Sequence, residues 1–162
     1  METEKYYILF VCLGNICRSP AAESIFRAMV TQRGLAACFE IDSACTYAGN
    51  SGQMPDLRMK AAAKRRGYSL AHIARPVRCS DFGLFDKILV MDDANYNDVC
   101  RLAPDVNTMQ KVVRIADYCR RHKVALVPDP YNGSSADFDH VLDILEDACT
   151  NLLAEWLKNN DC

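Results

Sequence analysis

Short apolar runs alternate with amphipathic stretches along this chain, and that order restricts its fold more than any other feature. The runs have the length and the branched or aromatic side chains of buried strands, and the stretches between them place apolar residues at helical spacing. Strands joined by helices need right-handed crossovers, which give a parallel sheet with helices on both faces. We therefore predict an α/β fold: a single doubly wound domain over residues 1–162 with a four-stranded parallel sheet.

Glycines, prolines and helix-capping residues give approximate bounds for these elements. Strands are expected at residues 6–11, 38–41, 88–91 and 112–115, and 124–127 is only strand-like because Pro128-Asp129-Pro130 follows it directly. Helices are expected from Ser19-Pro20 to Gly34, from Pro55 to Gly67, from an Asp92 or Asp93 cap to Pro104, and from a Ser134-x-x-Asp137 capping signal to Trp156. We interpret the basic cluster 64–66 as complementing the end of its helix rather than binding a partner.

The charge balance excludes several classes of protein. Nineteen basic and twenty-one acidic side chains give a formal charge of -2, which argues against a broad nucleic-acid or membrane surface but permits a small anion pocket. No run approaches the roughly 20 apolar residues of a membrane span. The first five residues are not a basic signal-peptide head. We expect a cytoplasmic protein without nucleic-acid or membrane partners.

Nine cysteines are an unusual number for 162 residues. They are odd in number and scattered, with no Cys-x-x-Cys pair and no Cys/His cluster at zinc-finger spacing. A disulfide framework and a structural metal are therefore not expected, and most of these cysteines should be small buried apolar residues of a reduced protein. We expect no metal and no cofactor.

The loop after the first strand contains the candidate catalytic residues, at the strand end where this fold binds ligands. It reads Cys12-Leu-Gly-Asn-Ile-Cys-Arg18, and Ser19-Pro20 begins a helix. Backbone N–H groups of such a loop can surround an oxyanion, Gly14 and Asn15 can make its turns, and Arg18 can bind two oxygens at once. A cysteine facing these donors is favoured as a thiolate nucleophile. A tight turn with a buried cysteine and a surface arginine is the alternative, but the placement favours a phosphate or related oxyanion site.

Residues 11–20 as a whole resemble the phosphate-binding loop of the low-molecular-weight protein tyrosine phosphatases. The similarity extends over nearly the whole chain, in the order that the family requires. Its further motifs are Ile41-Asp42-Ser43, Ala71-His72-x-Ala-Arg75, Met91-Asp92, and Asp129-Pro130-Tyr131 followed by Gly133.

The resemblance implies a role for each matching residue. Cys12 would be the nucleophile that forms a phosphocysteine, Arg18 would bind the phosphoryl group, and Asp129 would be the general acid and then the base. On its residues alone, Pro128-Asp129-Pro130 more often indicates a rigid turn. Backbone amides complete the phosphate site, Leu13 and Ile16 add apolar lining, and Tyr131 would be an aromatic wall, so that the substrate-binding set is Leu13, Gly14, Asn15, Ile16, Cys17 and Tyr131. Tyr47 is a candidate for the opposite wall.

Supporting roles are also implied by the family. Asn15, Ser19, Ser43 and His72 resemble its hydrogen-bond network, and Asp92 either orients the loop or only caps its helix. The family further implies that Cys17 can trap an oxidised Cys12 as a disulfide. One departure is Cys45, which stands where many members have glycine. The backbone conformation after the second strand is therefore not settled by the resemblance.

Three rival functions are weaker. An arsenate reductase of this fold needs further redox cysteines about seven residues apart in its mobile segment, whereas Cys79 and Cys100 are far apart. A protein-arginine phosphatase of the family carries threonine in place of Ile16. A non-catalytic phosphotyrosine-binding module would not need Cys12, Arg18 and Asp129 together. The expected partners are phosphotyrosine-containing proteins, and the expected state is a monomer, with weak dimerisation left open.

Overall fold

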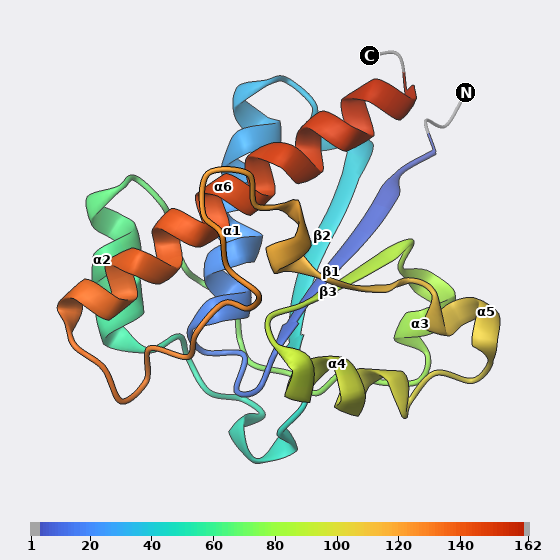
Figure 1. Ribbon diagram of the computed structural model, residues 1–162, viewed down its shortest axis with the longest axis horizontal. Coiled ribbons are helices and arrows are strands. Elements are labelled where there is room, and N and C mark those ends of the chain that lie inside the picture. The colour runs from blue at the N-terminus through green and yellow to red at the C-terminus, as the bar shows by residue number, and fades with distance from the viewer. Residues whose placement is uncertain (1–3, 161–162) are drawn as a thin grey trace.

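The computed structural model describes residues 4–160, in which four strands form one parallel sheet (Figure 1). The strands are β1 Tyr6–Cys12, β2 Phe39–Cys45, β3 Lys87–Val90 and β4 Val112–Arg114. Their order across the sheet is β2-β1-β3-β4, and every neighbouring pair is parallel. The strand order reverses at β1, so the loop after β1 lies at the position where doubly wound sheets bind ligands. The predicted fold class is confirmed.

Helices cover both faces of the sheet (Figure 1). On one side lie the longer helices α1 Arg18–Gln32, α2 Leu57–Arg65 and α6 Ser135–Asn160. On the other lie α3 Asp81–Leu84, α4 Asp93–Cys100 and α5 Val106–Met109. Single 3-10 turns occur at Ala36–Cys38, Ala48–Asn50 and Ile115–Tyr118. No helix within residues 4–160 is long and apolar enough to cross a membrane.

β1 reads as a continuous apolar run because both of its faces are buried. Ile8 and Phe10 pack into the core formed with α1 and α6, while Leu9 and Val11 pack into the second core, on the α4 side. All four side chains are fully buried. The strand that leads into the loop is therefore fixed from both sides.

Three sequence expectations were wrong in detail. Residues 124–127 do not form a strand: Val127 donates one backbone hydrogen bond to the Met91 carbonyl, and two prolines follow closely that cannot extend a ladder. β2 extends to Cys45 rather than ending at Ile41. Asp42 and Ser43 interrupt its apolar pattern, which is why an earlier end was expected, but both residues pair with β1 in the sheet. The second helix begins after an Asp56 cap rather than at Pro55.

The helix ends agree with most of the capping signals. Asp92 caps α4 by accepting the Asn95 N–H at 2.8 Å, and Asp137 accepts the Ser134 N–H at 2.7 Å at the start of α6. Gly34 ends α1 with a φ of 71°, in the left-handed region that glycine adopts easily. Arg66 differs from the other residues of the basic cluster, because its guanidinium pairs with acidic residues of α6.

One buried carboxylate fixes the segment that leads toward residue 129. Asp147 of α6 accepts the backbone N–H groups of Arg120, Arg121 and His122 at 2.9–3.1 Å. Burial alone would raise the pKa of Asp147, but these backbone hydrogen bonds outweigh it and lower the pKa to about 2. The carboxylate therefore stays ionised at neutral pH and holds the start of this segment against α6.

Candidate active site

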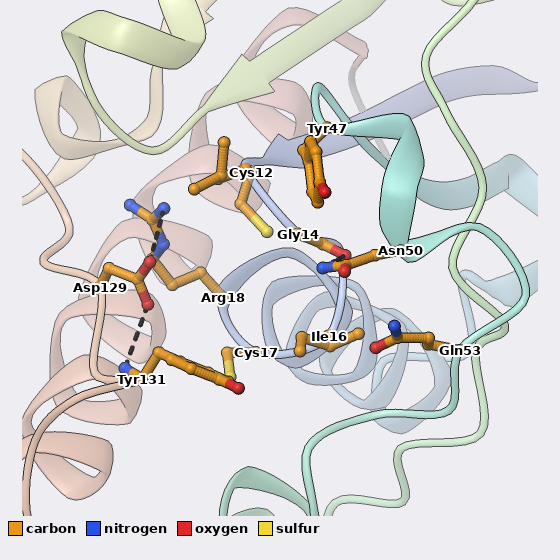
Figure 2. Close-up of a pocket in the computed structure, with 11 residues that line it drawn as sticks. Cys12, Gly14, Ile16, Cys17, Arg18, Tyr47, Asn50, Gln53, Asp129 and Tyr131 are labelled. Carbon is orange, nitrogen blue, oxygen red and sulfur yellow. Dashed lines mark hydrogen bonds and ion pairs between the residues drawn. The ribbon is translucent and has the colours of Figure 1, made fainter.

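Residues 12–18 form one side of a cavity of about 320 Å³ at the carboxyl end of β1 (Figure 2). The cavity brings together the loop, the segment after β2 and the segment before α6. Its lining residues are Cys12, Leu13, Gly14, Ile16, Cys17, Arg18, Tyr47, Asn50, Gln53, Asp129 and Tyr131. Sequence reasoning missed Asn50 and Gln53, which lie in a loop without a recognisable motif.

The Cys12 sulfur is buried at the bottom of this arrangement and faces hydrogen-bond donors. The Asn15 backbone N–H lies 3.2 Å from Sγ, and the Ser19 hydroxyl oxygen lies 3.0 Å from it. Ser19 Oγ also accepts a hydrogen bond from the Asn15 side-chain amide at 2.7 Å. Its own proton is therefore free to point at the sulfur, and this arrangement suits a negatively charged sulfur atom.

The loop continues directly into the N-terminus of α1. Cys17 is the N-cap residue, and its side chain makes no capping hydrogen bond. The first N–H groups of a helix carry a partial positive charge and bind anions readily. Burial raises the pKa of the Cys17 thiol far above its ordinary value, with the nearby Asp56 carboxylate as a smaller cause, so Cys17 is a neutral thiol.

Asn15 holds the loop in its shape. It is fully buried with a φ of 55°, the only described residue other than glycine in the left-handed region. Its Oδ1 accepts hydrogen bonds from His72 Nε2 at 2.8 Å and from the Arg75 backbone N–H at 3.1 Å. Its Nδ2 donates to the hydroxyls of Ser19 at 2.7 Å and Ser43 at 2.9 Å. One amide of the loop thus connects α1, β2 and the segment of residues 72–75.

The small size of Gly14 matters for a different reason than the expected one. Its φ is not in the left-handed region, so the turn itself does not demand glycine. A Cβ at this position would lie 2.6 Å from Nδ2 of Asn50, which donates a hydrogen bond to the Gly14 carbonyl at 3.2 Å. Gly14 therefore leaves room for Asn50 at the rim of the cavity.

A second layer of charged residues supports this network, and Glu23 is the member that sequence reasoning missed. Glu23 Oε1 accepts the Ser43 hydroxyl at 2.7 Å and lies 3.3 Å from His72 Nδ1. A usable signal was its spacing, since Glu23 lies four residues after Ser19 and therefore on the same face of α1. Asp42 lies 3.5 Å from the same His72 nitrogen.

Glu23, Asp42 and His72 are the one group of potential metal ligands within residues 4–160, with ligand atoms within 4.8 Å of one another. Arginines already balance both carboxylates: Arg27 lies 2.7 Å from Glu23 and Arg75 lies 2.9 Å from Asp42. Because the other His72 nitrogen bonds Asn15, we interpret the group as support for the loop and assign no metal to it.

Arg18 is buried and its guanidinium is held on two sides. Nη1 donates to Asp92 Oδ2 at 2.8 Å and to the Val127 carbonyl at 2.9 Å, while Nη2 lies 3.7 Å from Asp129 Oδ2. The other Asp92 oxygen caps α4, so this residue contacts the loop arginine and caps its helix at once. Asp92 therefore does more than cap its helix, and its role in orienting the loop stays a prediction.

Asp129 and two tyrosines lie around the mouth of the cavity (Figure 2). The side chain of Asp129 is 42% exposed, and its Oδ1 accepts the Tyr131 backbone N–H at 3.1 Å. Tyr47 lies on the opposite side of the loop from Tyr131, and its backbone N–H donates to the Leu13 carbonyl at 2.9 Å. The structure thus brings Tyr47 into the cavity wall, where the sequence left it only a candidate.

Cys45 occupies regular backbone despite standing where the family often has glycine. It pairs with Cys12 in the register of β1 and β2, and its φ is not positive. Its N–H and its thiol both donate to the Arg75 carbonyl, at 2.8 Å and 3.2 Å. Burial raises the pKa of this thiol. The substitution is therefore accommodated without local strain.

Comparison with known proteins agrees with this geometry. The family model "Low molecular weight phosphotyrosine protein phosphatase" matches residues 7–161. A Synechocystis protein named as a low molecular weight protein-tyrosine-phosphatase is 49% identical over 151 residues, which cover 93% of this chain and 96% of that protein. The human low molecular weight phosphotyrosine protein phosphatase is 40% identical over 134 residues, covering 83% of this chain and 85% of that protein.

A solved structure gives the same result. The protein tyrosine phosphatase of Entamoeba histolytica superposes with a TM-score of 0.93 at 42% identity, covering 96% of this chain and 99% of that one. Fold and family together define a hydrolase of the protein tyrosine phosphatase class. Within that class, the chain belongs to the low molecular weight phosphotyrosine protein phosphatase family.

Substitutions of Asn15 can separate the backbone strain from the hydrogen-bond network. Asn15→Gly loses the side-chain bonds but keeps easy access to positive φ, whereas Asn15→Ala loses both. We expect Asn15→Ala to have a free energy of unfolding about 1 kcal/mol lower than Asn15→Gly. Both variants should lose phosphatase activity, roughly 10- to 100-fold, because the loop is misplaced. Urea unfolding and steady-state kinetics measure the two effects.

Asn107 provides the matched control, because it is exposed and lies within α5. There the order of stability should reverse, with Asn107→Ala above Asn107→Gly, since glycine weakens helices. Equal stability of the two Asn15 variants would show that the left-handed conformation is not a constraint on this loop.

Proposed function

We propose that this protein hydrolyses phosphotyrosine in proteins, and small aryl phosphates, through a phosphocysteine on Cys12. Arg18 is the phosphate clamp, and Asp129 is the general acid and base. The protein works as a single domain over residues 1–162, as a cytoplasmic monomer, without metal or cofactor. The observation that carries the proposal is one cavity that holds the Cys12 sulfur, the buried Arg18 guanidinium and the Asp129 carboxyl at the N-terminus of α1.

Substrate binding uses charges that are already in place. The phosphate dianion binds the loop N–H groups and Arg18, which Asp92 and the Val127 carbonyl hold in position before substrate arrives. The similar Entamoeba histolytica phosphatase holds Hepes in its active site. Hepes carries a sulfonate, so we propose that a tetrahedral oxyanion takes the corresponding place in this cavity.

The first chemical step transfers the phosphoryl group to sulfur. The Cys12 thiolate attacks phosphorus as the bond from phosphorus to the tyrosine oxygen breaks, and Asp129 gives its proton to that oxygen. Arg18 and the loop N–H groups stabilise the charge on the equatorial oxygens. The products are tyrosine, phosphocysteine and the Asp129 carboxylate.

The second step returns the enzyme to its starting state. Asp129 removes a proton from a water molecule, which attacks phosphorus and breaks its bond to sulfur. Inorganic phosphate leaves, and the Cys12 thiolate and the Asp129 acid are restored. The 42% exposure of the Asp129 side chain gives this water a path from solvent.

An aryl phosphate fits the cavity better than the rival substrates. Tyr47 and Tyr131 lie on opposite sides of the loop, and Leu13 and Ile16 add apolar lining, so a phenyl ring would meet aromatic and apolar surfaces. Ile16 also lacks the hydroxyl of the threonine that the arginine phosphatases carry at this position. These features favour phosphotyrosine over phosphoarginine, and also over phosphoserine, which has no ring to meet these surfaces.

Cys12→Ser provides the principal test. We expect it to abolish turnover and to retain binding of phosphate or vanadate, because the loop and Arg18 remain. The parent protein should hydrolyse phosphotyrosine peptides in preference to phosphoserine and phosphoarginine peptides, without inhibition by chelators. Phosphate release and isothermal titration measure both effects. Turnover by Cys12→Ser at the parental rate would exclude this mechanism. A preference for phosphoarginine peptides would exclude phosphotyrosine as the main substrate.

Asp129→Ala tests the general acid. We expect a loss of about 10²- to 10⁴-fold in kcat on phosphotyrosine. The loss should shrink for aryl phosphates whose leaving phenolate is more stable, since such groups need less protonation. A series of substituted phenyl phosphates measures this trend. Asp98→Ala, a matched control at an exposed ion pair, should leave every rate unchanged. A loss that is equal across the series would contradict the acid role.

We also propose that Cys17 protects Cys12 from irreversible oxidation. Peroxide converts the Cys12 thiolate to a sulfenic acid, and the Cys17 thiol then displaces water from it to form a disulfide. Cys17 is itself a poor target for peroxide, because burial raises the pKa of its thiol. Mass spectrometry after mild peroxide treatment should find a Cys12–Cys17 disulfide, and Cys17→Ser should give sulfinic acid at Cys12. Sulfinic acid in the parent protein without the disulfide would be evidence against protection.

A further inference from the structure

A second, cationic groove lies next to the catalytic cavity, between α2 and the start of α6. It has a volume of about 240 Å³ and is lined by Arg58, Ala61, Arg65, Ser135 and Phe138. The first three residues follow helical spacing on α2, so two guanidinium groups share one face. The proposed mechanism uses none of these residues.

Arg58 connects this groove to the catalytic cavity. Its guanidinium carbon lies 5.3 Å from the centre of the Tyr131 ring and 4.8 Å from that of Phe138. Tyr131 lines the catalytic cavity, and Phe138 lines the groove. The two hollows are therefore neighbours, separated by the Tyr131 ring and the Arg58 guanidinium.

The charges of the groove are not balanced. Asp56 pairs with Arg58 at 2.9 Å and is largely buried, but Arg65 makes no ion pair within residues 4–160. The acidic residues nearest in sequence on α6 are already engaged, Asp137 with Ser134 and Asp139 with Arg66. The N-terminus of α6 lies on the same side, but Asp137 in its first turn offsets the partial positive charge there, so the groove's excess positive charge is that of Arg65. The groove is thus suited to a negatively charged group.

We propose that this groove binds an acidic side chain of the substrate protein, two or three residues from the phosphotyrosine. The inference rests on the proposed function, because it needs a phosphotyrosine ring in the cavity beside Tyr131. An extended peptide advances about 3.3 Å per residue, so such a side chain lies about 7–10 Å along the chain and reaches across the Tyr131 ring. Arg65 is then a specificity-determining residue, and its guanidinium pairs with the carboxylate.

The test compares phosphotyrosine peptides that differ only in flanking charge. One pair carries three glutamates or three glutamines before the phosphotyrosine, and a second pair carries them after it. In low salt we expect the glutamate peptide of at least one pair to have a kcat/KM about 2- to 5-fold higher, the usual worth of a partly exposed ion pair. The ratio should approach one in about 0.5 M salt, which screens such pairs.

Arg65→Gln should remove this preference, and Arg65→Glu should reverse it in favour of lysine-flanked peptides. Arg33→Gln is the matched control, because it removes the same charge at the far end of α1, about 22 Å along that 15-residue helix. It should leave the ratio unchanged. Hydrolysis of glutamate and glutamine peptides at equal rates, or a preference that survives Arg65→Glu, would exclude the acidic subsite while leaving the proposed function intact. Failure to hydrolyse any of these peptides would exclude both.

Discussion

The Asn15 amide is the contact on which the rest of the site depends. Its two amide hydrogens and its oxygen bond Ser19, Ser43, His72 and the backbone of residue 75, so one buried side chain joins α1, β2 and the segment before α3. The left-handed conformation at this residue has a cost that asparagine tolerates better than most residues. Once the amide is in place, the Asn15 N–H faces Cys12, and the Ser19 hydroxyl is free to do the same.

The site that we propose for an anion must remain stable when no anion is bound, and the contacts of Arg18 show how this is achieved. Asp92 and the Val127 carbonyl hold one guanidinium nitrogen at 2.8 and 2.9 Å, while Asp129 lies 3.7 Å from the other. The short contacts fix the orientation of the buried arginine. The long contact between Nη2 and Asp129 is weak, so an oxyanion of the proposed substrate can replace it.

The sequence predicted the fold and most of the cavity because both depend on local patterns. Apolar runs revealed the four strands, and the loop motif identified Cys12 and Arg18. Asn50 was missed because its importance comes from a contact with a distant residue, which no local spacing displays. Glu23 had a local signal in its spacing from Ser19, although its partner Ser43 lies 20 residues away. The role of Gly14 was misassigned because the Asn50 side chain that fits against it lies 36 residues away in sequence. The strand-like reading of 124–127 failed because apolar content alone does not show a hydrogen-bonding partner.

The two sides of the cavity are supported in different ways, and this difference separates catalysis from specificity. The loop side rests on a buried network in which the Asn15 amide bonds with both its nitrogen and its oxygen, so most substitutions there would disturb the proposed nucleophile. The other side is held mainly by its backbone: Val127 donates to the Met91 carbonyl and Gly133 to the Pro130 carbonyl. Between them, Asp129 accepts the Tyr131 N–H, and the Arg58 guanidinium lies beside the Tyr131 ring. Because Tyr131 is half exposed and makes no hydrogen bond to the Asn15 network, residues of α2 that face it can change without altering that network. Under the proposed mechanism, substrate preference can therefore diverge on α2 and at the start of α6 while the chemistry at Cys12 stays the same.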